Sequence, residues 1–146
     1  MKTNPFSLHL SQVYLLIVLV SLSGCMGDGS EPIPELAEVT GVITLDGKPI
    51  KAANVTFEPE SAGENGRRRA SSGTTEKDGT YKLQYNPNAL GATLGKHKVT
   101  IMKMSDNPDE AGKHLVPPKY NDSSTSGLTA EVTQGENKFD FDLKSK

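Results

Sequence analysis

The chain contains no tryptophan and a single cysteine among its 146 residues, and aromatic residues make up only 5% of it. One thiol excludes an intrachain disulfide, so the fold has to rest on packing alone. Without tryptophan, the aromatic platforms that commonly stack against sugars are scarce. The formal net charge of −2 predicts neither a nucleic-acid partner nor another strongly charged polymer. The length favours one domain once any targeting segment is removed.

The N-terminal segment carries the pattern of an export signal. Lys2 supplies a positive charge, residues 13–20 (VYLLIVLV) form an unbroken apolar run, and small residues follow. A bilayer-spanning helix needs roughly 20 apolar residues, and this run is much shorter. The pattern therefore predicts a signal helix over residues 1–24 that is cleaved from the mature protein. An uncleaved N-terminal anchor is the less favoured alternative.

The single cysteine lies directly after this segment. Leu22-Ser23-Gly24-Cys25 resembles the bacterial lipobox, Leu-[Ala/Ser]-[Gly/Ala]-Cys. The resemblance implies cleavage between Gly24 and Cys25 and attachment of a diacylglyceryl group to the Cys25 sulfur. Two or three acyl chains hold a protein stably on a bilayer, whereas one holds it marginally. The sequence thus predicts a lipoprotein of the cell envelope, anchored to the inner or outer membrane and facing the periplasm or the exterior.

A polar segment separates the cysteine from the predicted domain. Residues 25–37 combine glycine, proline and acids with no periodic apolar pattern, which is typical of a flexible tether. The predicted domain occupies residues 38–144. Over this range apolar residues recur at every second position, and the turn signals Asp46-Gly47 and Asp78-Gly79 fall between the apolar stretches. We expect strands at residues 39–45, 53–58, 72–75, 81–85, 97–101, 128–132 and 139–143.

Seven short strands with regular turns and no helical window predict an all-β fold, a seven-stranded antiparallel β-sandwich. Several motifs support a more specific resemblance, to the carboxypeptidase regulatory-like domain, which is a transthyretin-like (prealbumin-like) sandwich. They are residues 39–43 (VTGVI), 46–50 (DGKPI), 53–57 (ANVTF), 74–81 (TTEKDGTY) and 95–101 (GKHKVTI). Residues 118–122 and 125–128 are similar to the later segment of small bacterial lipoproteins that carry this domain. The resemblance implies the fold far more than a function, because one fold hosts many functions.

Two long polar loops, residues 61–70 and 106–126, are the expected contact surface, since loops on a rigid scaffold carry function. The first contains the basic run Arg67, Arg68 and Arg69. These arginines either bind anionic groups or belong to a loop that is merely solvated. The second contains His114 and Tyr120. Tyr120 is the best candidate for an exposed aromatic, with packing over the sandwich edge as the alternative.

The sequence offers little for catalysis or for metal binding. His97 is expected on an inward strand face and His114 in a loop, and neither has further ligands at a suitable spacing, so no metal and no cofactor are predicted. No G-x-S-x-G motif occurs, and the C-terminus lacks the Tyr-Arg-Gly-Ser tail of hydroxyisourate hydrolases.

We therefore expect a non-catalytic binding or structural module, anchored to the membrane through Cys25, with an envelope protein or a glycan as possible partner. The alternative is an enzyme or small-ligand carrier with a site near His97, His114 and Tyr120.

Overall fold

The computed structural model describes residues 32–63 and 66–146. The predicted signal peptide, the cleavage site at Gly24 and Cys25, and the tether as far as Glu31 lie outside these residues. In the part that is described, no helix is both long and apolar enough to cross a membrane. Residues 32–146 form one compact unit, to which the rest of this description refers.

The first sheet is built around one long strand, β1 (Leu36–Leu45). Five short strands pair with it along its length. Three of them run antiparallel to β1: β2 (Lys48–Pro49), β5 (Thr80–Lys82) and β8 (Ala92–Thr93). The other two run parallel to it: β11 (Glu136–Lys138) and β12 (Phe141–Leu143).

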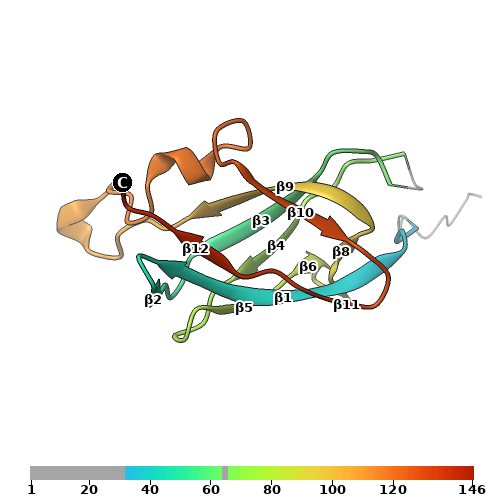
Figure 1. The fold of residues 1–146 in the computed structure, drawn as a ribbon, viewed down its shortest axis with the longest axis horizontal. Helices are drawn as coiled ribbons and strands as arrows, with labels where there is room; N and C mark the ends of the chain where they lie inside the picture. Colours follow the sequence, from blue (N-terminus) through green and yellow to red (C-terminus); the bar gives the residue numbers. More distant parts are fainter. Residues whose placement is uncertain (1–31, 64–65) are drawn as a thin grey trace, which may run out of the picture. The chain divides into compact units, whose positions relative to one another are not determined.

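The second sheet is antiparallel throughout and has six strands. Their order is β10 (Leu128–Val132), β9 (Gly95–Met102), β3 (Asn54–Pro59), β4 (Ser71–Thr74), β6 (Gln84–Asn86) and β7 (Ala89–Leu90). Two single 3-10 turns, η1 (Pro108–Glu110) and η2 (Pro118–Asn121), lie in the long connection between β9 and β10. Figure 1 shows β1 and its partners in one layer and β3, β9 and β10 in the other.

The core lies between the two sheets and uses the faces that the alternation predicted. Phe57 is fully buried at its centre. The rings of Tyr81, His97, Phe139 and Phe141 surround it, with centroids 5.8 to 6.4 Å away. Tilted and edge-on aromatic contacts at such distances add to the hydrophobic gain from burial. The predicted all-β sandwich is confirmed.

The predicted strand at residues 81–85 is in fact two strands that belong to different sheets. β5 pairs with β1, whereas β6 pairs with β4. Leu83 lies at the crossover, where its amide donates to Val39 O at 3.0 Å and its carbonyl accepts from Gly91 N at 2.8 Å. The inward faces of Tyr81, Leu83 and Tyr85 are nevertheless as predicted, because all three side chains are buried.

The C-terminal region also departs from the expected pattern. One antiparallel strand was expected at residues 139–143, but two strands, β11 and β12, pair parallel to β1 on either side of Asp140. The Asp140 side chain interrupts the ladder because its Oδ1 accepts from Val42 N at 2.8 Å. At the other end, β1 begins at Leu36, ahead of the predicted domain start at residue 38, and Ala37 is buried.

Candidate functional site

The three arginines of the first loop are all exposed, as a contact loop would require. Arg69 and Arg68 both contact the domain. The Arg69 guanidinium lies 5.3 Å from the centroid of the Tyr85 ring, and its Nε donates to Tyr85 O at 3.1 Å. Arg68 donates to Glu60 O at 3.5 Å, at the margin of a hydrogen bond. Arg69 therefore has a packing role.

Tyr120 is not an exposed platform, so that prediction is wrong and the alternative, packing over the sandwich edge, is confirmed. Its side chain is buried within η2, and its hydroxyl accepts from Lys144 N at 3.0 Å. The Lys119 ammonium lies 4.9 Å from the ring centroid. The ring fills a gap beside the core, and the hydroxyl satisfies a backbone amide after the last strand.

His97 points into the core, as predicted, and is 1% exposed. Its Nδ1 lies 3.0 Å from Gly95 O and its Nε2 lies 3.3 Å from Thr93 Oγ1. Burial lowers the pKa of His97, although the Gly95 carbonyl and, more weakly, Glu60 oppose this. The ring is therefore held neutral at neutral pH, as part of the core.

His114 is exposed and lies far from His97. It forms an isolated bridge with Met104, beyond the C-terminal end of β9, whereas His97 lies near the beginning of that strand. Seven residue steps of extended chain lead from His97 to Met104, which is about 23 Å at the usual rise of a strand. The structure does not bring His97, His114 and Tyr120 together into one site.

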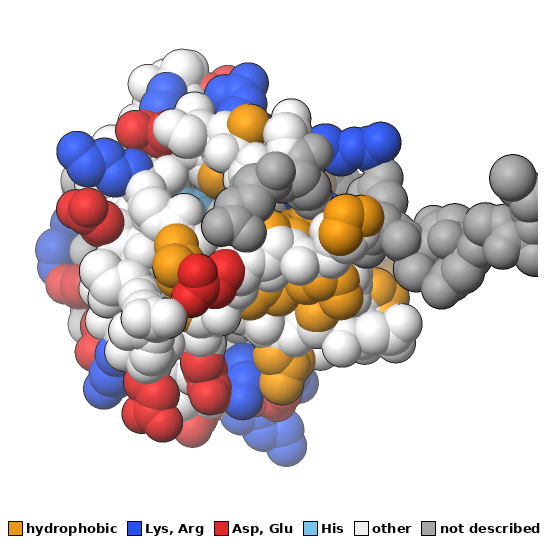
Figure 2. Space-filling view, turned by 90° about the vertical axis from the view of Figure 1, so that its right-hand side faces the viewer, with side chains coloured by type: hydrophobic (Ala, Val, Ile, Leu, Met, Phe, Trp, Pro, Cys, Tyr) orange, Lys and Arg blue, Asp and Glu red, His pale blue; other side chains and the backbone are white. Residues whose placement is uncertain are grey.

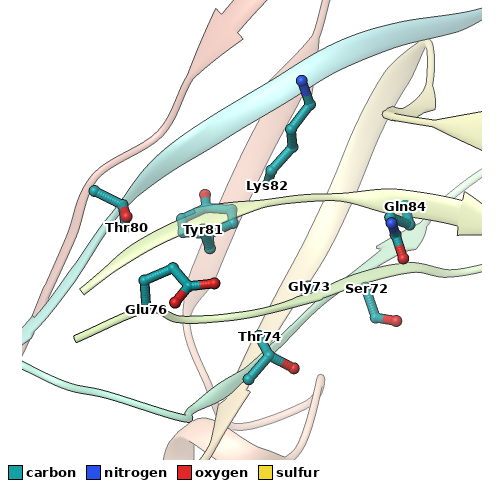
Figure 3. A pocket seen from close by; sticks show the side chains of 8 residues that line it. All are labelled: Ser72, Gly73, Thr74, Glu76, Thr80, Tyr81, Lys82 and Gln84. Carbon is teal, nitrogen blue, oxygen red and sulfur yellow. The ribbon is translucent and has the colours of Figure 1, made fainter. Parts of the chain in front are cut away.

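A polar hollow of about 440 Å³ opens where β4 and β5 diverge. Figure 3 shows Glu76 at one end of it and Ser72 and Gln84 at the other, with one strand on each side. Lys82 on the rim forms an ion pair with Glu38 of β1 at 2.6 Å. The lining is rich in hydroxyl, amide and charged groups, which can exchange hydrogen bonds with a polar ligand.

The crossover between the sheets creates this hollow. Because β4 pairs with β6 and β5 pairs with β1, the two strands cannot stay bonded to each other along their whole length. Gly73 allows their close approach at one point, since a Cβ there would lie 2.4 Å from Lys82 O. This hollow was not predicted from the sequence, although a glycine inside a strand commonly marks a close backbone approach.

The two long loops meet at another hollow, of about 370 Å³. Arg68 of the first loop and Ser123 of the second line it, together with Glu58, Glu60 and Lys98. The predicted loops therefore do share a surface, of mixed charge and open to solvent.

A further hollow of about 440 Å³ lies toward the opposite end of β9 and has a more apolar lining. It includes Leu45, Ile50 and Leu115, with Lys103 beside them. The Lys103 stem is buried, while its ammonium reaches Asp106 at 2.7 Å. That hydrogen bond lowers the pKa of Asp106.

Across the described residues, no three or more His, Cys, Asp and Glu side chains are grouped so that they could hold a metal ion. The arrangement supplies hydrogen-bond partners and charge, which suits binding.

Comparison with known proteins gives only weak structural similarities. No family model and no curated protein sequence matches the chain. Among solved structures, it is similar to a DUF3823 family protein from Parabacteroides merdae, at 12% identity and a TM-score of 0.40, over 76% of this chain and 47% of that one. It is also similar to catechol 1,2-dioxygenase from Acinetobacter, at 17% identity and a TM-score of 0.36, over 82% and 55% of the two chains. The same enzyme from Pseudomonas arvilla gives 16% identity and a TM-score of 0.31, with the same coverage. The chain thus spans about half the length of each of these structures. By its architecture, it is an all-β sandwich protein.

Proposed function

We propose that this chain is an exported lipoprotein, held on a membrane of the cell envelope through Cys25, whose β-sandwich is a non-catalytic binding or structural module. The sandwich resembles a carboxypeptidase regulatory-like domain. The observation that carries the proposal is the placement of the only cysteine, at the end of Leu22-Ser23-Gly24-Cys25 and directly after the apolar run of residues 13–20.

Two further observations support it. A free thiol is a liability in an exported protein, and acylation removes it. The His97 ring and the Tyr120 hydroxyl, which are buried in the sandwich, bond to groups of the domain itself. They are therefore explained by stability, without a reaction.

The anchor is tested by expressing the full-length chain in a bacterium, separating membrane from aqueous fractions, and determining the mass of the N-terminal peptide. We expect the wild-type protein in the membrane fraction with acyl chains on Cys25. The C25S variant should lose the acyl chains, whereas S23A, which keeps a residue that the lipobox accepts, should retain them. A wild-type protein with a free thiol in the aqueous fraction would overturn the anchor.

The binding role is tested by crosslinking neighbours to the membrane-bound protein. Deleting the second loop would remove Tyr120 from its packing site, so point substitutions are the cleaner choice. We expect R67A/R68A to lose crosslinked partners that K48A/K51A retains. K48A/K51A is the matched control, because each pair of substitutions removes two exposed cations. If the two variants and the wild type capture the same neighbours, the first loop is no contact surface.

A further inference from the structure

One end of the sandwich exposes large aliphatic side chains close to the point where the described chain begins. Ile33 and Leu90 are each 51% exposed, and Leu94 is 37% exposed. Figure 2 looks onto this end and shows hydrophobic side chains gathered there, with charged side chains of both signs mostly around them. Such a group of aliphatic side chains facing water is a candidate interaction surface.

The contacts of the first strand bring these residues to the same end. Leu94 lines a hollow together with Pro34, which directly follows Ile33. Leu36 of β1 pairs with Thr93, the residue before Leu94. On the other side of β8, Gly91 approaches the Ala37 backbone so closely that a Cβ would lie 2.1 Å from Ala37 O, which places the neighbouring Leu90 beside the start of β1.

The covalent chain limits how far this end can be from the lipid anchor. Seven residue steps separate Cys25 from Pro32. Even a fully extended chain gains at most about 3.6 Å per residue, so Pro32 cannot be more than about 25 Å from Cys25. An acylated Cys25 lies at the bilayer surface, because its acyl chains are inserted in the bilayer. The end that carries Ile33 is therefore kept close to the membrane.

The opposite end of the domain provides a reference point. Leu115 is 41% exposed, and its amide donates to Lys103 O, just beyond the end of β9. Leu94 directly precedes the same strand. The nine residue steps of extended chain from Leu94 to Lys103 correspond to about 30 Å. Leu94 and Leu115 thus have the same side chain and similar exposure, and they lie near opposite ends of β9.

From the short tether and the exposed aliphatic side chains, we propose that the end formed by Ile33, Leu90 and Leu94 rests against the lipid bilayer. This inference depends on the proposed acylation of Cys25. Charge does not decide it, because Arg67 and Lys96 at this end are accompanied by Glu35 and Glu60. The short tether selects this end over the end with Leu115, Met102 and Met104, which is also exposed, and the aliphatic side chains of this end then gain by leaving water for the interface. The hollow lined by Leu45, Ile50 and Leu115, toward the opposite end of β9, then remains accessible to partners in the aqueous space.

The absence of tryptophan makes a direct test possible, because one substitution introduces a unique fluorophore. L94W, I33W and the control L115W are expressed as full-length chains, purified from membranes and reconstituted in phosphatidylcholine–phosphatidylglycerol vesicles. A fraction of the lipids carries a doxyl quencher near the headgroup. We expect L94W and I33W emission to shift to the blue and to be quenched several-fold more strongly than L115W emission. I33W covers the case that L94W does not fold.

The outcomes separate the inference from the function on which it rests. Equal quenching at the two ends, in protein whose Cys25 carries acyl chains by mass spectrometry, would overturn the orientation alone. A blue shift that depends on protein density and is insensitive to doxyl lipid would mean that a second copy covers this end, which also overturns it. Protein without acyl chains on Cys25 would overturn the anchor and this inference together.

Discussion

The phenol hydroxyl of Tyr81 donates a hydrogen bond of 2.8 Å to the backbone carbonyl of Phe139, next to Gly41 of β1. A Cβ on Gly41 would lie 1.8 Å from that carbonyl oxygen and 2.8 Å from the Tyr81 ring. On the same stretch, Phe139 N donates to Thr40 O at 2.9 Å. Three segments distant in sequence thus meet where only hydrogen fits as a side chain, and this contact holds the C-terminal segment beside β1.

The G41A variant is expected to lose about 3 kcal/mol of unfolding free energy, the upper end of the cost of overpacking, because backbone atoms would have to move. The control G47A changes a turn residue with φ of 76° and open space around its Cβ position. It should cost only the left-handed strain, about 1 kcal/mol. Urea unfolding measures both values. Equal losses in the two variants would contradict the close-contact explanation.

Burial, with a smaller contribution from Asp140, raises the pKa of Tyr81 well above its usual value. The folded state therefore keeps the proton at a pH where the unfolded chain loses it. This contribution to stability is complete below about pH 10, the usual tyrosine value, and is lost as the pH rises above it. We expect Y81F to be about 1–3 kcal/mol less stable at neutral pH, because Phe139 O loses its donor. The variant should also show a weaker alkaline decline. An unchanged decline would contradict the assignment to Tyr81.

Asp142 should contribute to the loss of stability in acid. Hydrogen bonds from Lys144, Thr44 Oγ1 and Gly47 N, in that order, lower the pKa of Asp142 to about 2. The carboxylate therefore stabilises the fold above its unfolded value near 4, and this contribution is lost as the pH falls toward 2. We expect D142N to be less stable than D109N at pH 6, with the difference vanishing near pH 2. D109N removes the same charge from an exposed position on η1. A difference that is independent of pH would contradict this prediction.

His97 should also make stability depend on pH, but in a higher range. Because burial lowers its pKa in the folded state, stability is complete above the unfolded value of about 6.5 and falls as the pH drops through the lowered value. We expect wild type and H114Q to lose stability between pH 7 and pH 5, and H97Q to lose less over that interval. Urea midpoints at the two pH values test this. An equal decline in H97Q would show that another group is responsible.

Asn137 links the last turn to the first strand. Its Oδ1 accepts from Thr133 N at 2.9 Å, and its Nδ2 lies 2.8 Å from Thr133 O and 3.3 Å from Glu38 O. We expect N137A to cost about 2–3 kcal/mol, because buried backbone groups lose their partners. The control N121A removes an exposed amide in η2 and should stay within about 0.5 kcal/mol of the wild type. Thermal unfolding measures both, and a similarly small loss in N137A would contradict the link.

Local chemistry made most of the sandwich predictable. The two-residue alternation identified Val55, Phe57 and Ile101 as core residues, and all three are fully buried. Asp46 and Gly47, expected at a turn, both have positive φ. These features depend on neighbours in sequence, so they can be read without the fold. The candidate site was less predictable: the arginines of the first loop are exposed as expected, whereas the hollow between β4 and β5 carries no local signal apart from Gly73.

The sequence by itself determined the strand periodicity, the inward faces and the placement of its only cysteine after an apolar run. Only the tertiary structure decided which strands pair. It placed the C-terminal strands parallel to β1, divided residues 81–85 between two sheets at Leu83, and buried Tyr120. The physical reason is that alternation gives every strand one buried face and one exposed face, so the pattern does not distinguish one pairing partner from another. The choice of partner then depends on contacts between distant segments, such as Tyr81 with Phe139, which no single segment encodes.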